Sequence, residues 1–174
     1  MSDRAFKVVN HTEKKVDSHA LVRGKGVFTE DLAPENALVV KLLKSPHAHA
    51  RIKHIDASMA EQLEGIECVL TYKDIKPISY TRAGQGYPEP SPYDTHLLGQ
   101  KVRFVGDTVA LVAGKDLKTV KKALKLIEVE YEVLDPVLDF EHAMDEGTPV
   151  IHDQEDTVNI YDASRNLAQH YDMS

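Results

Sequence analysis

The clearest pattern of apolar and polar positions lies between residues 108 and 133. Residues 108–113 (TVALVA) form an apolar run of strand length, and Asp116 follows as a candidate helix cap. Apolar residues then recur at intervals of three, four and three, as on one face of a helix: Leu117, Val120, Leu124 and Ile127. Residues 127–133 alternate apolar side chains with glutamates, which is typical of a strand with one wet face. The pattern predicts a strand, a helix and a strand in a βαβ-type layer.

The first half of the chain predicts three further strands. They are residues 37–43, 52–55 and 66–70, and Pro46 ends the first because it cannot donate to a ladder. Short helices are expected after three residues of capping type: Asp56, Thr71 and Asp139. Together the pattern predicts an α/β (α+β) domain.

The two ends and one internal segment lack a clear pattern. Residues 1–20 are polar and are interpreted as a leader or linker, and residues 153–174 as a tail, which leaves residues 21–152 as the domain. Residues 76–96 hold four prolines and three tyrosines and predict a long loop. Because long loops are often interfacial and tyrosine is common at interfaces, we expect this loop to contact a larger assembly.

Composition excludes several classes of protein. The net charge of −7 disfavours binding to a phosphate backbone, so no nucleic-acid partner is expected. Cys68 is the only cysteine, which excludes an intramolecular disulfide and an iron–sulfur cluster held by this chain alone. We expect Cys68 to be a buried, inert thiol. The sequence has no apolar run of bilayer length and no secretory signal, so we expect a cytoplasmic protein without a membrane partner.

Candidate chemical motifs are weak. His47 and His49 share one face of an extended chain, but the carboxylate and third histidine of a metal site are missing from useful positions, so a structural pair is the favoured interpretation. The two Gly-x-Gly fragments, at residues 24–26 and 84–86, lack the third glycine of a dinucleotide fingerprint. Two charged groups are interpreted as solvated faces: Lys118, Lys121, Lys122 and Lys125, and Glu128, Glu130 and Glu132. No catalytic, cofactor-binding or metal-binding residue is predicted.

Several stretches, taken in order, resemble a known family. Residues 23–31 (RGKGVFTED), 45–52 (SPHAHARI), 105–113 (VGDTVALVA) and 128–137 (EVEYEVLDPV) are similar to segments of the large subunits of molybdenum hydroxylases. Asp56, residues 65–66 and residues 71–75 resemble the run that follows the second of these segments. The match covers roughly residues 20 to 152. The chain is thus similar to the N-terminal α/β-hammerhead domain of the xanthine dehydrogenase and aldehyde oxidase family, in which short crossover helices accompany a mixed sheet.

This resemblance implies a non-catalytic structural or interface domain of an oxidoreductase. The parent enzyme would hydroxylate a purine, a related N-heterocycle or an aldehyde, with water as the oxygen source. It would use molybdopterin-bound molybdenum, with [2Fe-2S] clusters and possibly FAD on a partner domain or subunit. The implied partners are the remainder of the molybdopterin-binding subunit and the iron–sulfur domain or subunit. Two alternatives stay open, a free-standing binding module and a small metalloprotein that uses His47 and His49.

Overall fold

The computed structural model describes residues 6–82 and 91–172 and divides the chain into two units. The first unit, residues 1–37, contains one turn of α-helix, α1 (Ser18–Val22), and a 3-10 helix (Thr29–Leu32), neither of which has a buried residue. The second, residues 38–174, holds the strands and the core, and we call it the main unit. No helix in the described part of the chain has the length and hydrophobicity of a membrane span.

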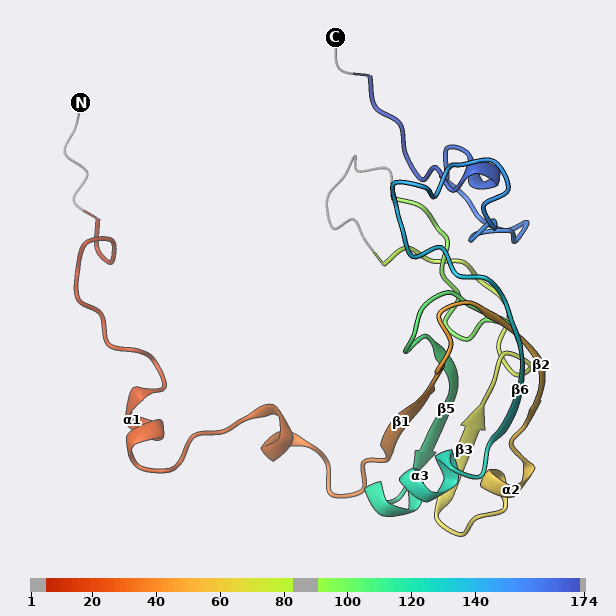
Figure 1. Cartoon of the computed structure of the whole chain (residues 1–174). Helices are drawn as coiled ribbons and strands as arrows, with labels where there is room; N and C mark the ends of the chain where they lie inside the picture. The colour runs from red at the N-terminus through yellow and green to blue at the C-terminus, as the bar shows by residue number, and fades with distance from the viewer. Residues whose placement is uncertain (1–5, 83–90, 173–174) are drawn as a thin grey trace, which may run out of the picture. The chain divides into compact units, whose positions relative to one another are not determined.

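The main unit contains two sheets of three strands each (Figure 1). In the first sheet β5 (Thr108–Gly114) lies between β1 (Val39–Lys44) and β3 (Ile66–Leu70). In the second sheet β2 (Ala50–Asp56) lies between β4 (Lys101–Val102) and β6 (Glu128–Val133). All four of these strand pairings are antiparallel. The hammerhead fold class is confirmed, and the predicted strands at 37–43, 52–55, 66–70, 108–113 and 127–133 each form within two residues of their expected limits.

One part of the predicted topology is wrong. The strand, helix and strand of residues 108–133 form as predicted, but β5 and β6 belong to different sheets. The segment therefore crosses from one sheet to the other and is not a βαβ unit within a single layer. The connecting helix α3 (Leu117–Leu124) begins after Asp116, whose carboxylate accepts the backbone N–H of Thr119 at 2.9 Å.

The predicted short helices are only partly present. Helix α2 (Ser58–Glu61) forms after Asp56, whose carboxylate accepts the N–H of Ser58. The helices expected after Thr71 and Asp139 are turns instead. In both turns the capping hydrogen bond is made, from the Thr71 N–H to Asp74 at 2.7 Å and from the Glu141 N–H to Asp139 at 3.0 Å. Neither cap continues into a helix. Pro77 follows six residues after Thr71, and the apolar side chains that follow Asp139 do not pack, since Phe140 is 86% exposed and Met144 45%.

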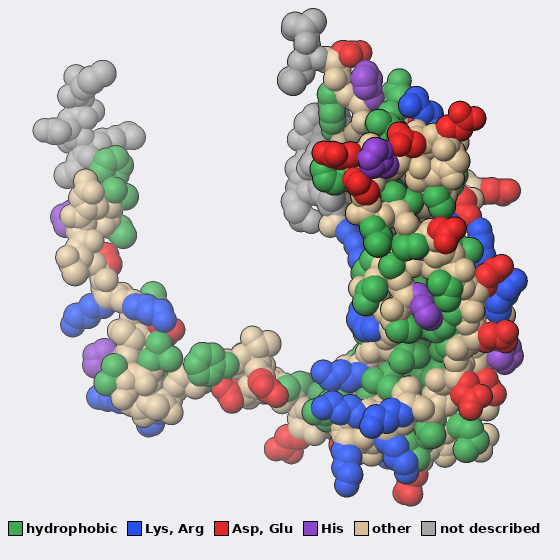
Figure 2. Space-filling model, viewed as in Figure 1, with side chains coloured by type: hydrophobic (Ala, Val, Ile, Leu, Met, Phe, Trp, Pro, Cys, Tyr) green, Lys and Arg blue, Asp and Glu red, His purple; other side chains and the backbone are tan. Residues whose placement is uncertain are grey.

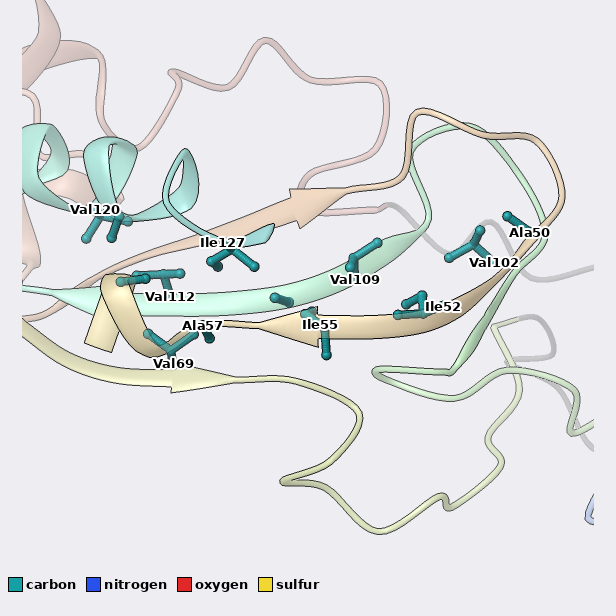
Figure 3. Packing of buried hydrophobic residues seen from close by; sticks show 13 residues of the cluster. Ala50, Ile52, Ile55, Ala57, Val69, Val102, Val109, Val112, Val120 and Ile127 are labelled. Atoms are coloured by element: carbon teal, nitrogen blue, oxygen red, sulfur yellow. The ribbon is translucent and has the colours of Figure 1, made fainter. Parts of the chain in front are cut away.

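The core fills the space between the sheets and the two helices (Figure 3). The side chains of Val120 and Val112 lie between α3 and β5, and Ile52 and Ile55 enter from β2. Gly114 sits where three elements meet, and a β-carbon there would come within 2.8 Å of the Gly65 carbonyl and 2.9 Å of Val120. The core is aliphatic, as the low aromatic content of the sequence suggests, and it fixes how the two sheets face each other.

The ends of the predicted loop at residues 76–96 are ordered by backbone pairing. Tyr80 pairs with Thr95, and Tyr93 pairs with Val158 of the C-terminal segment. Its Pro88, Pro90 and Tyr87, and the fragment Gly84–Gly86, lie outside the described residues. The segment predicted as a tail from residue 153 thus runs back along the main unit, where it forms bridges and a further 3-10 helix (Ala163–Arg165).

Candidate functional site

The two histidines of the His-x-His motif contact different neighbours. The ring of His47 packs edge-on against Tyr131 with centroids 4.9 Å apart. His49 is buried, and its Nδ1 lies 2.7 Å from the carbonyl oxygen of Asp135, so Nδ1 donates because a carbonyl can only accept. Its Nε2 is buried without a hydrogen-bond partner among the described residues. These contacts tie the turn before β2 to β6 and to the segment that follows it, in keeping with a structural role.

No metal-ligand set converges in the described part of the chain. Residues 6–82 and 91–172 contain no group of three or more histidine, cysteine, aspartate or glutamate side chains placed to hold a metal ion. Cys68 is half-buried in β3 and not fully buried as predicted. The expectation that this chain has no metal, cofactor or catalytic residue stays a prediction.

The charged faces singled out in the sequence are exposed. The lysines at 118, 121, 122 and 125 lie on the outer side of α3, and Lys and Arg side chains gather at the end of the main unit where α3 lies (Figure 2). The glutamates at 128, 130 and 132 are exposed on β6, and Glu132 pairs with Lys53 at 3.2 Å. Of the Gly-x-Gly fragments, Gly24 adopts a positive φ of 66° in the N-terminal unit, as expected of a flexible turn.

The densest group of ion pairs and side-chain hydrogen bonds in the described part of the main unit was not predicted from the sequence. Asp153 accepts hydrogen bonds from Arg51 and, at 2.9 Å, from the largely buried Lys101. The guanidinium of Arg103 donates to the carbonyl oxygen of Ile151 at 3.1 Å and to the side chain of Gln154. We call these residues the ionic cluster: Arg51, Lys101, Arg103, Asp153 and Gln154. The cluster binds residues 151–154 to β2 and to the segment around β4.

Burial and charge shift the ionisation of this cluster. Burial lowers the pKa of the Lys101 ammonium, against the hydrogen bond from Lys101 to Asp153. Burial acts to raise the pKa of Asp153, but the hydrogen bond and charge of Lys101, together with Arg51, outweigh it, so that pKa lies below its ordinary value. The Asp153 carboxylate therefore stays ionised and paired at neutral pH. A buried charge without its partner is costly, so each group depends on the others.

A cavity of about 340 Å³ adjoins the cluster. His152 lines it, with Nε2 3.7 Å from the Asp94 carboxylate and Nδ1 buried without a hydrogen-bond partner in residues 6–82 and 91–172. Burial, followed by the positive charge of Arg103, lowers the pKa of His152. The remaining charges on the wall are of both signs, Arg82 and Lys101 against Asp94 and Asp107. Two of the wall's cations are paired with carboxylates, Arg82 at 3.7 Å from Asp107 and Lys101 with Asp153. The third, Arg103, donates to neutral oxygens of the chain, those of Ile151 and Gln154.

The arrangement is suited to holding a segment in place. The donors of the cluster already meet acceptors of the chain itself. His96, which also lines the cavity, has its Nε2 2.7 Å from the Asp156 carboxylate and 3.1 Å from the Ser79 hydroxyl. That hydroxyl donates to Asp156 at 2.8 Å, so the three groups bind one another and hold the C-terminal segment to the loop at residues 76–96.

Sequence reasoning missed the ionic cluster because residues 151–154 have no periodicity and β4 is only two residues long. The one available signal was the combination of Lys101 with Arg103 at alternating positions, which can place two cations on one face.

Comparison with known proteins identifies the fold. Residues 23–135 match the family model described as the aldehyde oxidase and xanthine dehydrogenase a/b hammerhead domain. The structure is similar to that of a Cu,Mo-CO dehydrogenase, with a TM-score of 0.70 and 34% identity over 81% of this chain and 17% of that one. The chain therefore belongs to the hammerhead-domain family of molybdenum-containing hydroxylases.

Individual relatives are much longer than this chain. A probable hypoxanthine oxidase, XdhD of Escherichia coli O157:H7, is 46% identical over 149 residues, which are 86% of this chain and 16% of the relative. The carbon monoxide dehydrogenase large chain of Afipia carboxidovorans is 35% identical over 144 residues, 80% of this chain and 17% of that protein. The chain thus spans about a sixth of the length of these two relatives.

Proposed function

We propose that this chain is a non-catalytic structural and interface domain of the molybdopterin-binding subunit of a larger molybdenum hydroxylase. The observation that carries the proposal is the match of residues 23–135 to the hammerhead-domain family. Because the chain spans only about a sixth of two relatives, the matching domain is part of a much longer protein in each of them. The substrate would be a purine or related N-heterocycle, or an aldehyde, hydroxylated with oxygen from water. The similarity to a probable hypoxanthine oxidase favours the first of these classes.

The residues of this chain do not fit the cofactors of such an enzyme. A [2Fe-2S] cluster needs several thiolates, and the sequence has only Cys68. The described residues also bring together no metal-ligand set. We therefore assign the molybdenum cofactor, the [2Fe-2S] clusters and any FAD to other domains or subunits. A reducing cytoplasm, which keeps a single thiol free, is the compartment that we propose.

Within the assembly, this domain would contact the remainder of the subunit and the iron–sulfur domain or subunit. The loop at residues 76–96 was expected to make such a contact, and this stays a prediction. The backbone pairings of Tyr80 with Thr95 and Tyr93 with Val158 support it, because they hold both ends of the loop in a defined place. A loop with fixed ends loses less conformational entropy when it docks.

The proposal is tested on the protein as the cell makes it. The chromosomal gene is given an affinity tag, and the purified complex is analysed for polypeptide masses, for molybdenum and iron, and for oxidation of hypoxanthine and of an aldehyde. We expect molybdenum in the tagged complex, and no metal and no turnover in the 174-residue chain produced alone. A native product without molybdenum would contradict the proposal, as would turnover by the isolated chain.

A further inference from the structure

The outward surface of the first sheet has an apolar patch, beside which Lys41 and Lys44 of β1 and Glu67 of β3 are exposed. We call this patch the outer sheet face, and it consists of Val40, Leu42, Cys68, Leu70, Leu111 and Ala113. Strand register places these residues together, because Val40 and Cys68 both stand opposite Ala113, and Leu42 and Leu70 both stand opposite Leu111. Directly paired residues of antiparallel strands point to the same side of a sheet. Four pairings therefore connect the six side chains into one surface across three strands.

The opposite side of the same sheet makes the core. Leu43, Val69 and Val112 belong to the core or pack against it, whereas the core cluster includes no member of the outer sheet face. Val40 is 49% exposed and Leu42 is 39% exposed, Cys68, Leu70 and Leu111 are half-buried, and Ala113 on the central strand is buried. The wet side of an antiparallel sheet is normally polar. An apolar patch on such a side is typical of a surface that another protein segment covers.

We propose that the outer sheet face is the surface on which the remainder of the large subunit docks, an inference that rests on the proposed function. Stable complexes between separate proteins bury about 800 Å² on each partner. Six side chains, most of them already half-buried, offer much less than that. A second copy or a freely diffusing partner would therefore bind this surface weakly.

A tethered partner does not need so large an area. A segment on the same polypeptide faces the surface at an effective concentration in the millimolar range, so a small apolar contact is enough to hold it. The length of the relatives supports such a partner, because the matching part is only 16% of the probable hypoxanthine oxidase. The docking surface of the remainder should itself be apolar and uncharged, because a charge buried there would have no counter-charge on this face.

Cys68 gives a direct measurement of whether the face is covered. It is the only cysteine of the chain and stands among the six residues of the outer sheet face. We would follow alkylation of Cys68 by N-ethylmaleimide, read by mass spectrometry of its peptide, in the isolated chain and in the tagged native enzyme. Coverage should slow the reaction by about tenfold or more in the native enzyme. Equal rates in the two forms would overturn the proposal.

Two matched substitutions control for general damage. Leu42→Lys puts a charge on the outer sheet face, and Met59→Lys puts the same charge on α2 at a residue that is 61% exposed. Both variants should leave the isolated chain folded, as followed by circular dichroism. In the native enzyme, Leu42→Lys should restore rapid alkylation of Cys68 and lower the recovery of molybdenum with the tagged chain, whereas Met59→Lys should do neither. Continued protection of Cys68 in the Leu42→Lys enzyme would overturn the proposal.

The outcomes separate this inference from the proposed function. A native enzyme that contains molybdenum but leaves Cys68 as reactive as in the isolated chain would refute the docking face alone. A native product with neither molybdenum nor a further polypeptide segment would refute both. Protection of Cys68 in a dimer of the isolated chain, seen by analytical ultracentrifugation, would assign the face to a second copy and overturn the proposed occupant.

Discussion

The two sheets of the main unit present opposite kinds of outward surface. The six residues of the outer sheet face carry no charge, and the exposed charges of that sheet stand beside them on its two edge strands, at Lys41, Lys44 and Glu67. The second sheet instead exposes charged and imidazole side chains: Arg51, Lys53, His54, Glu128, Glu130 and Glu132. Both sheets are antiparallel and both contribute their inner sides to one core. The difference therefore does not come from strand direction or from the core.

The comparison distinguishes a sheet face that is built to stay hydrated from one that is not. Glutamates at every second position of β6 keep its outer side hydrated, and Lys53 pairs with Glu132 across the strands. On the first sheet Lys41 and Lys44 flank the outer sheet face but do not replace its apolar side chains, and Val40 and Leu42 remain 49% and 39% exposed. If this face stayed exposed to solvent in the mature protein, charged residues at positions 40 and 42 would make it more soluble. Their absence supports a partner that covers the face.

The largest effect is expected when the inner side of a sheet is cut back. Ile52 is fully buried, so Ile52→Ala should lower the free energy of unfolding by about 2–5 kcal/mol. Leu42→Ala, on the outer sheet face, should cost less than about 1 kcal/mol in the isolated chain, because its side chain is already partly in water. Urea unfolding followed by circular dichroism measures both. Equal losses of unfolding free energy in the two variants would mean that the outer sheet face is already packed in the isolated chain. The contrast between the inner and outer sides of the sheets would then be wrong.

An intermediate effect is expected at the ionic cluster. Asp153→Asn removes the carboxylate that Lys101 and Arg51 share, and leaves the largely buried Lys101 ammonium with a weaker partner. We expect a loss of about 1–3 kcal/mol in unfolding free energy. Glu130→Gln on the exposed side of β6 is the control and should change stability by less than about 0.5 kcal/mol. A loss as small as that of the control would show that the cluster does not hold residues 151–154.

Acid should weaken the same region in two steps. The pKa of His152 is lowered, so the unfolded chain takes up this proton first and stability begins to fall below about pH 6.5. The pKa of Asp153 is also lowered, so its contribution is complete above about pH 3.9 and is lost as the pH falls through the lower folded value. Asp153→Asn should keep the first step and reduce the second, which the lowered pKa values of Asp56, Asp116 and Asp156 would still produce in part. Thermal melts between pH 7 and pH 3 would show both steps.

The smallest effect is expected on the charged outward surface. Lys53 and Glu132 are 57% and 44% exposed in their side chains, so Lys53→Ala should cost less than about 0.5 kcal/mol. The difference from the wild-type chain should shrink further at high salt, which screens exposed charges. Chemical denaturation at low and high ionic strength measures it. A loss above 1 kcal/mol that persists in salt would mean that this face, too, is more than a hydrated surface.

Local patterns predicted local structure well. The alternation in residues 127–133 and the helix spacing after Asp116 each depend on neighbours in sequence, and both elements formed. The turns at Thr71 and Asp139 show the limit, since a capping carboxylate is a local signal but a helix needs an apolar stripe that packs. The assignment of β5 and β6 to separate sheets could not be predicted, because the spacing of apolar residues and their strand propensity do not determine which strands pair.

The ionic cluster was missed for a related reason. Asp153 meets partners that precede it by 102 and 52 residues, Arg51 and Lys101. A carboxylate in a segment without periodicity gives no sign of a partner so far away. The family resemblance recovered the fold class, because it rests on the order of several motifs and not on any single element. It could not supply the cluster or the outer sheet face, since both depend on where side chains meet in space.

The pairing of β1 with β5 has a consequence for synthesis on the ribosome. Val39 stands opposite Gly114, so β1 finds its neighbour only after 75 more residues have been made. At about 5–20 residues per second, that interval lasts roughly 4–15 s. During it, the apolar strand Val39–Lys44 is a nascent segment without its sheet, open to misfolding or to capture by a chaperone. Folding of this domain during translation should therefore wait for the synthesis of β5. Codons that slow the translation of residues 108–114 should lower the yield of folded protein.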